Sequence, residues 1–300
     1  MPVDLHQRLS EFSYGYGVTR EVERLLQSVG LRTTPFLPSL LQEKKLAFDA
    51  AFDRPGTPLL LQFKLGEALQ RLRWKASTEP PTILGRPFWR FNIDTAEPSG
   101  QFDLLLKSER AGAEVYYVAP RFTSWDGYML AYESSEVLER SLLLSPSQID
   151  AELMGAGEPD GPHRILYDGL KSFVCSEPRE LIEVSARDLA HKVRTDIERR
   201  SRRMDVALRD VHLALERQRE IRVRRPTSET DREIPYVMQL AMPGELATSW
   251  DHLAADRSRR FSHFRDRAVS ESDAQFAILG FEAWAIGSQL LAVTIPKSER

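Results

Sequence analysis

The segment Leu59–Leu65 limits the possible folds of this 300-residue chain more than any other part of the sequence. It reads Leu-Leu-Leu-Gln-Phe-Lys-Leu, and such a run of large apolar residues is typical of a strand that is buried on both faces. Gln62 and Lys64 interrupt the pattern, and burying an amide or an ammonium group is unfavourable unless it is hydrogen-bonded or paired. The segment therefore predicts a central strand that carries two polar residues for a specific purpose.

A second strand is predicted just before it, at Ala47–Phe52, with Arg54-Pro55-Gly56-Thr57 as the turn between the two. In a hairpin centred on that turn, Asp49 lies directly opposite Gln62, and opposed residues share a face with their Cβ atoms about 5 Å apart. Lys64 shares the face because it is two residues further along the strand. The sequence thus predicts a carboxylate, an amide and an ammonium group on one side of a hairpin.

Residues 39–122 as a whole alternate short helix and strand patterns, as expected for an α/β domain. Ser39 and Gln42 form a capping box that predicts a helix start, and Glu43 on this helix can reach the same end of the sheet. The later predicted elements are a strand at Phe88–Ile93, a helix at Gln101–Glu109, a strand at Glu114–Ala119, a helix near Trp125–Tyr132, strands at Ser141–Leu144 and Arg164–Tyr167, and a surface loop at Ala151–Pro162.

With these residues and this order, the segment 39–122 resembles the core of the restriction-endonuclease-like, or PD-(D/E)XK, nuclease superfamily. The resemblance implies an α/β (α+β) fold with a central mixed sheet flanked by helices, and a Mg²⁺ or Mn²⁺ cofactor. Gln62 stands where most members have a second acid, as in the Gln-x-Lys form of Mrr-like restriction enzymes. The amide removes one negative charge from the site and should weaken metal binding.

Site roles follow from the same resemblance. It makes Asp49 the principal metal ligand, and the Gln62 side-chain oxygen and the Phe63 main-chain carbonyl complete the site. Lys64 becomes the catalytic lysine, Glu43 an accessory ligand, and Gln101 a polar residue that faces the site. Such a metal polarises a phosphoryl oxygen and lowers the pKa of a bound water, while a lysine offsets the developing charge.

Two segments flank the predicted nuclease-like domain at 39–183. The N-terminal extension, 1–38, carries an aromatic, glycine-bearing turn at Phe12–Gly17 and a short helix at Thr19–Val29 that Gly30 would end. The segment 184–300 is predicted to be mainly helical, with one long helix over 185–222. Phe276–Ile295 is apolar but contains Glu282, so it predicts a buried helix followed by a strand rather than a membrane span.

Arginines cluster in the middle of the long predicted helix, at Arg199, Arg200, Arg202 and Arg203. Clustered arginines can follow a phosphate backbone, which makes these residues candidates for binding nucleic acid. Acids are interspersed along the same helix, and a solvated helix with i,i+4 ion pairs that docks on a partner protein or on its own domain explains the pattern equally well.

Composition limits the remaining function classes. The formal net charge of −3 provides no global field for nucleic acid, so any such binding needs a local patch. A single cysteine, Cys175, fits a reducing compartment, and the N-terminus lacks the apolar core of a signal peptide, so we expect a cytoplasmic protein with no membrane partner. The sequence has no phosphate loop, dinucleotide fingerprint or serine nucleophile elbow, and its histidines lack zinc-like spacing.

Two hypotheses follow. The first is a metal-dependent endonuclease that acts on DNA more readily than on RNA, and by analogy it would serve bacterial antiviral defence or restriction. The second is a catalytically inactive scaffold or nucleic-acid-binding subunit that keeps the nuclease fold and docks to a larger complex through the 185–222 helix. An ordinary α/β domain, with Lys64 extended toward solvent and Asp49 as a surface acid, remains the plain alternative.

Overall fold

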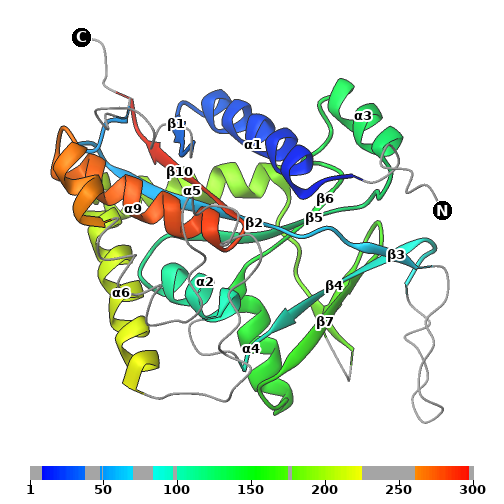
Figure 1. Ribbon diagram of the computed structural model, residues 1–300. Coiled ribbons are helices and arrows are strands. Elements are labelled where there is room, and N and C mark those ends of the chain that lie inside the picture. Colours follow the sequence, from blue (N-terminus) through cyan, green and yellow to red (C-terminus); the bar gives the residue numbers. More distant parts are fainter. Residues whose placement is uncertain are drawn as a thin grey trace, which may run out of the picture.

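A computed structural model describes residues 9–37, 48, 50–69, 84–96, 100–174, 178–224 and 261–296, with the backbone alone for residues 218–224. These residues form a mixed α/β structure with two five-stranded sheets (Figure 1). Glu43 and Asp49, two predicted site residues, lie outside the described residues, as does the predicted helix start at Ser39. In the described part of the chain, no helix is long and apolar enough to span a membrane.

The first sheet has the strand order β1-β10-β2-β5-β6. Its strands are β1 (Arg32–Pro35), β2 (Gly56–Phe63), β5 (Glu114–Pro120), β6 (Ser141–Leu144) and β10 (Ser288–Thr294). The central strand β2 pairs antiparallel with β10 and parallel with β5. All eight residues of β2 are buried, which confirms the central strand predicted from the apolar run.

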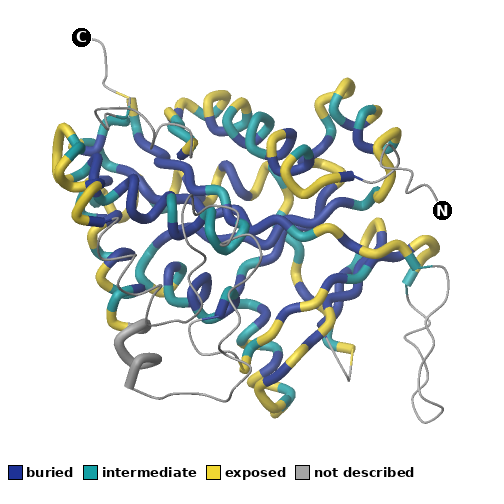
Figure 2. The backbone as a smooth tube through the Cα atoms, viewed as in Figure 1, coloured by how far each residue is buried: buried dark blue, intermediate teal, exposed yellow. Residues whose placement is uncertain are grey.

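Helices cover both faces of this sheet, so alternate residues of each strand enter different cores (Figures 1 and 2). Leu59, Leu61 and Phe63 pack beneath α1 (Glu11–Ser28), α3 (Trp125–Glu133) and α5 (Ala186–Arg200). Leu60 faces the opposite core, with α2 (Gln101–Arg110), α4 (Pro146–Ala156), α6 (Met204–Arg224) and α9 (Glu271–Ala285). Leu104 and Leu105 of α2 are buried on this side.

The second sheet has the order β3-β4-β7-β8-β9 and continues from the end of β2. Its strands are β3 (Glu67–Leu69), β4 (Phe88–Asp94), β7 (Pro162–Tyr167), β8 (Ser172–Val174) and β9 (Arg179–Leu181). The link Lys64–Gly66 joins the sheets and passes close to Tyr167, because a Cβ on Gly66 would lie 2.3 Å from the Tyr167 hydroxyl oxygen. Lys64 therefore lies at the junction between the two sheets.

The predicted hairpin between Ala47–Phe52 and β2 is wrong. Both edges of β2 are occupied, and Gln62 lies opposite Ser288 of β10 and Tyr117 of β5. Phe48 and residues 50–52 form no strand. The Phe48 amide donates to Asp273 at the start of α9, whereas the Gln62 side chain donates to the Gly287 carbonyl just past the other end of α9. At a rise of 1.5 Å per residue, these two ends of α9 are about 20 Å apart.

The single long helix predicted over 185–222 is also wrong, since α5 and α6 are separate. Ser201 adopts a left-handed conformation, with φ of 46°. The connection between the helices bonds to the approach to β2, where the Gly56 amide donates to the Arg202 carbonyl and the Met204 amide donates to the Arg54 carbonyl. These tertiary hydrogen bonds outweigh the continuous helical pattern of the sequence.

Other local predictions had mixed outcomes. The helix and strand expected within Phe276–Ile295 are confirmed as α9 and β10. The turn expected at Phe12–Gly17 is wrong, because these residues belong to α1, which Ser10 caps through the Ser13 amide. Gly30, with φ of 80°, ends α1 as predicted. Much of the loop expected at Ala151–Pro162 is instead helix α4.

Candidate functional site

Ligands of open α/β sheets usually bind beyond the carboxyl ends of parallel strands. In this sheet, β2 and β5 are the parallel pair, and both end beside the second sheet. Polar side chains gather there from α1, β2, α2 and the residue after β5. We call Glu11, Gln62, Lys64, Gln101 and Arg121 the carboxyl-end site.

Lys64 directly follows β2, and its amide donates to the Val118 carbonyl of β5 at 3.0 Å. Its side chain is half-buried at the junction of the two sheets. Burial lowers the pKa of this ammonium group from its ordinary value, and the negative charge of Glu11 opposes the shift. A half-buried lysine with a lowered pKa beside one carboxylate is a common feature of reactive sites, although structural ion pairs share it.

Glu11 is the first residue of α1, and α1 is held close to the end of β2. A Cβ on Gly15 would lie 2.6 Å from the Phe63 ring, so glycine permits this approach. Glu11 lies at the surface, yet burial of its carboxyl group raises its pKa, and the nearby Lys64 lowers it. The charges of Glu11 and Lys64 therefore influence each other, a proximity that the sequence did not indicate.

Gln62 is buried, with 1% of its surface exposed, and its amide is fully engaged. The Nε2 group donates to the Phe63 carbonyl at 3.1 Å and to the Gly287 carbonyl at 3.2 Å. The Oε1 atom accepts from the Ser288 hydroxyl at 2.5 Å. These contacts satisfy the polar group that the apolar strand pattern had marked as unusual, and they tie β2 to β10.

Gln101, the first residue of α2, is bound to the same turn as Gln62. Its Nε2 group donates to the Ile286 carbonyl at 2.6 Å, one residue before the Gly287 carbonyl that accepts from Gln62. Gly287 has a φ of 77°, which favours glycine at this turn. The structure thus brings Gln62 and Gln101 together across three elements, and both bond to main-chain carbonyls.

Arg121 follows β5 and supplies a second cation at this edge. Its guanidinium forms an ion pair with Glu183 and donates to the Asp168 carbonyl at 2.7 Å. Burial acts to raise the pKa of Asp168, but main-chain amides of Leu170, Gly85 and Lys171 donate to this carboxylate and hold its pKa below the ordinary value. The bonds to Glu183 and Asp168 hold the Arg121 side chain in place. Its position directly after a predicted strand is the sequence feature that could have identified it as a site residue.

The predicted metal site is not assembled from the described residues. These residues contain no group of three or more His, Cys, Asp or Glu side chains that could hold a metal ion. Glu11 is the carboxylate beside Lys64, while the Gln62 oxygen and the Phe63 carbonyl both accept hydrogen bonds within the chain. A Mg²⁺ site here would need additional carboxylates, and the predicted ones, Glu43 and Asp49, lie outside the described residues.

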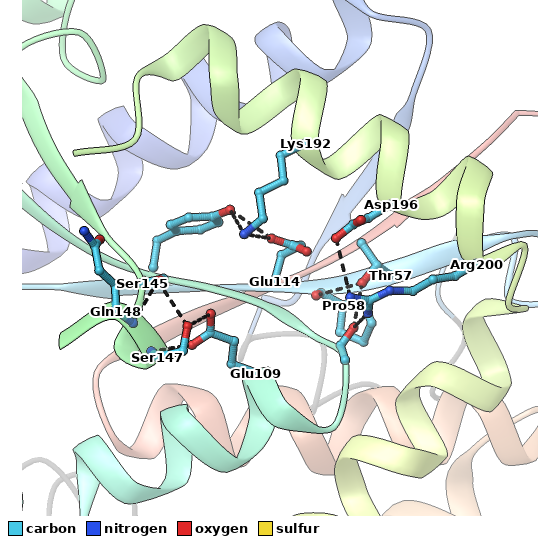
Figure 3. Close-up of polar contacts among 12 residues, drawn as sticks. Thr57, Pro58, Glu109, Glu114, Ser145, Ser147, Gln148, Lys192, Asp196 and Arg200 are labelled. Atoms are coloured by element: carbon cyan, nitrogen blue, oxygen red, sulfur yellow. Dashed lines mark hydrogen bonds and ion pairs between the residues drawn. The ribbon is translucent and has the colours of Figure 1, made fainter. Parts of the chain in front are cut away.

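The predicted arginine cluster lies at the opposite, amino end of β5. Arg200 donates to the Gly112 carbonyl at 3.0 Å, and Arg202 donates to the carbonyls of Gly112 and Ala111 at 3.2 and 3.3 Å (Figure 3 shows Arg200). Arg199 and Arg203 are more exposed, and each pairs with an acid close to it in sequence, Asp196 and Asp205 respectively. Two of the four arginines thus hold the turn between α2 and β5.

A buried carboxylate lies close to these arginines. Glu114, 4% exposed, accepts from the Tyr116 hydroxyl at 2.8 Å and pairs with the Lys192 ammonium at 3.0 Å, below α5 (Figure 3). Burial raises the pKa of Glu114, while Lys192 and Tyr116 partly oppose the shift and Asp196 adds to it. We call Glu114, Tyr116, Lys192, Arg200 and Arg202 the amino-end cluster.

Comparisons with protein-family models, with curated proteins and with solved structures gave no match for this chain.

Proposed function

We propose that this chain is a nuclease of the restriction-endonuclease-like superfamily, which hydrolyses DNA phosphodiester bonds with Mg²⁺ or Mn²⁺ at the carboxyl-end site. The observation that carries the proposal is the position of Lys64. It follows a fully buried central strand, lies beside Glu11 and has a lowered pKa. Because the described residues do not form a metal site, the proposal requires carboxylates from outside them.

The topology around Lys64 supports the proposal. Strand β2 carries Gln62 and Phe63 and is followed directly by Lys64. Strands β3 and β4 of the second sheet come next, then helix α2 and then β5, which lies parallel and adjacent to β2. This strand–helix–strand unit has the order of the later core elements of the superfamily. Its carboxyl end presents Lys64 where an anionic substrate would approach, whereas Arg121 is paired with Glu183.

Lys64 would act through its charge. An ammonium group at a half-buried position stabilises negative charge on a phosphoryl oxygen more strongly than one in water does. Glu11 favours the charged form of Lys64 and so helps to keep the ammonium protonated near neutral pH. Gln62 and Gln101 would hold the turn 286–288 against the end of β2 and α2.

The test is metal-dependent cleavage of plasmid DNA and of single-stranded DNA and RNA, with Mg²⁺, Mn²⁺ or EDTA. We expect the wild type to cut in either metal and not in EDTA, and Lys64→Ala and Asp49→Ala to lose at least about 100-fold in rate, the usual loss for removal of one transition-state contact. Lys107→Ala is the matched control, because Lys107 is also half-buried but lies near the end of α2.

Circular dichroism should show that every variant is folded. Equal cleavage by the wild type and Lys64→Ala would contradict the proposal. So would the absence of cleavage in both metals, combined with metal binding by Asp49→Ala that equals that of the wild type in calorimetry.

One observation favours the second candidate function, a scaffold or nucleic-acid-binding subunit without catalysis. Every polar atom of the Gln62 amide is bonded inside the chain, so this residue needs no metal to satisfy it. In a scaffold, Lys64→Ala would alter neither stability nor partner binding, whereas Gln62→Leu would destabilise the fold by leaving the Ser288 hydroxyl unsatisfied.

A further inference from the structure

Exposed aromatic side chains line the outer surface of α1 and α3. Phe12 is 84% exposed, Tyr16 58% and Trp125 39%. The Tyr16 and Trp125 rings are linked through those of Tyr132, which is half-buried, and Tyr128, which is buried. The Tyr16 and Tyr132 centroids are 6.4 Å apart, Tyr132 and Tyr128 are 5.7 Å apart, and Tyr128 and Trp125 are 5.4 Å apart. We call these five residues the aromatic strip.

The strip is held on a firm base. Tyr128 donates a hydrogen bond to the Ser13 carbonyl at 2.7 Å, and a Cβ on Gly17 would lie 2.9 Å from the Tyr128 hydroxyl oxygen. The Arg20 guanidinium lies over the Tyr132 ring, 4.6 Å from its centroid. The two helices lie side by side (Figure 1), and their close contact orders the rings before any partner binds.

Core packing explains Tyr128, which belongs to the core beneath α1, and Tyr132, which packs against it, but it does not explain Phe12, Tyr16 and Trp125. The buried side of α1 is made by Tyr14, Val18 and Val22, while Phe12 and Tyr16 lie one helical turn apart on the outer side. An aromatic side chain can bury about 150–250 Å², and three exposed ones on adjacent helices are unusual on a surface without a partner. Tyrosine, tryptophan and arginine together are the residues enriched in the energetic centres of protein interfaces.

The charges around the strip favour one kind of partner. Residues 11–28 and 125–140 contain seven carboxylates and three arginines, although Glu21 accepts from the Val137 and Leu138 amides and Glu136 pairs with Arg140. Asp126 and Glu133 are exposed on α3 beside the strip. An acidic rim repels a polyanion, and a two-fold pairing with a second copy of the chain would place acids against acids. An acidic rim instead attracts a segment whose apolar side chains are flanked by lysine or arginine.

We propose that the aromatic strip is a docking surface for a basic, apolar segment of another protein. The rings form the apolar centre of the interface, and the acidic rim selects the positive flanks of the partner. This inference goes beyond the proposed nuclease activity and does not depend on it, because binding is measured without cleavage.

The test uses synthetic amphipathic helices of roughly 18 residues, or five turns, labelled for fluorescence anisotropy. One peptide carries leucine on one face and lysine on the other, the second replaces lysine by glutamate, and the third replaces leucine by serine. We expect the wild type to bind the leucine–lysine peptide alone. The Phe12→Ser/Tyr16→Ser double variant should bind it about tenfold more weakly or worse, as after loss of interface hot spots. Leu170→Ser, an equally exposed apolar position after β7, should leave binding unchanged.

Three outcomes would overturn the proposal. Equal binding of the serine–lysine peptide, or equal binding by the double variant, would mean that charge alone drives association. Tighter binding of a thymidine oligonucleotide, lost in the double variant, would assign the strip to nucleic acid. A wild-type dimer in sedimentation velocity that the double variant abolishes would assign it to a second copy of the chain.

Discussion

The two ends of the parallel pair β2 and β5 both carry charged residues, but they use them differently. In the amino-end cluster, Arg200, Arg202 and Lys192 reach across to main-chain carbonyls or a buried carboxylate of other elements. At the carboxyl-end site, Lys64 and Glu11 influence each other's pKa while Glu11 stays at the surface. The first arrangement joins α5 and α6 to the sheet, and the second leaves a cation and an acid accessible.

This contrast shows that a cluster of like charges in a sequence does not identify the functional surface. The arginines at 199–203 looked like the phosphate-binding candidates, yet two of them cap the turn between α2 and β5. The isolated Lys64 at the end of an apolar strand is the better candidate, because its environment perturbs it without a network of structural bonds.

Replacing Arg202 should produce the largest change in stability. Its side chain is 24% exposed, and it bonds to two carbonyls and to Asp210. We expect Arg202→Met to lower the free energy of unfolding by about 2 kcal/mol, the value of hydrogen bonds made by a charged group. Urea unfolding measures this, with Arg199→Met, at a 67% exposed position, as the control. If both variants unfold at the wild-type urea concentration, the amino-end cluster is not structural.

The next effect concerns the pH dependence of stability. Because the folded-state pKa of Glu114 is raised above its ordinary 4.5, its protonated form stabilises the fold fully below 4.5, and this contribution is lost as the pH rises through the folded pKa. Glu114→Gln cannot ionise, so the wild type should lose stability relative to this variant over that range. Urea unfolding of both proteins across the range measures the difference, and a difference that stays constant with pH contradicts the assignment.

A smaller effect is expected at the carboxyl-end site. Glu11 opposes the lowering of the Lys64 pKa, so Glu11→Gln should lower it further. If the ammonium form of Lys64 is the active one, the cleavage rate falls as the pH rises through this pKa. In the variant, this alkaline fall of the cleavage rate should therefore occur at lower pH than in the wild type. The pH profile of cleavage measures the shift, and Glu139→Gln, at an exposed position away from the site, controls for a general loss of surface charge. An unchanged limb would mean that the two groups are not coupled in function.

The smallest effect is expected for the two exposed arginines. Arg199 and Arg203 pair with acids two or three residues away in the sequence, and such exposed pairs contribute little. We expect the Arg199→Ala/Arg203→Ala variant to unfold within about 0.5 kcal/mol of the wild type. It should also bind duplex DNA as the wild type does in an electrophoretic mobility assay. A clear loss of DNA binding would restore this cluster as the nucleic-acid surface.

The sequence predicted most local elements because their signals are local. The apolar run of β2, the valines and tyrosines of β5 and the apolar segment of α9 and β10 each identify a buried element without reference to the rest of the chain. The helix α1 was missed at its start, because the glycines at 15 and 17 suggested a turn. Their actual use is to let α1 approach Phe63 and Tyr128.

Strand pairing could not be read from the same signals. The hairpin prediction assumed that β2 pairs with its neighbour in sequence, whereas its antiparallel partner is β10, more than 200 residues later. Nothing near Gln62 in the sequence indicates Ser288 or Gly287 as its hydrogen-bond partners. The Glu11–Lys64 pair was missed for the same reason, since it depends on how α1 packs on the sheet.

The most direct test of the account compares Lys64→Met with Arg202→Met by the rate of metal-dependent DNA cleavage per folded molecule. The account predicts that Lys64→Met stays as stable as the wild type and loses cleavage, while Arg202→Met is destabilised and its folded fraction cleaves at the wild-type rate. Full cleavage by folded Lys64→Met, with loss of cleavage in folded Arg202→Met, would contradict it and place the function at the amino end of the sheet.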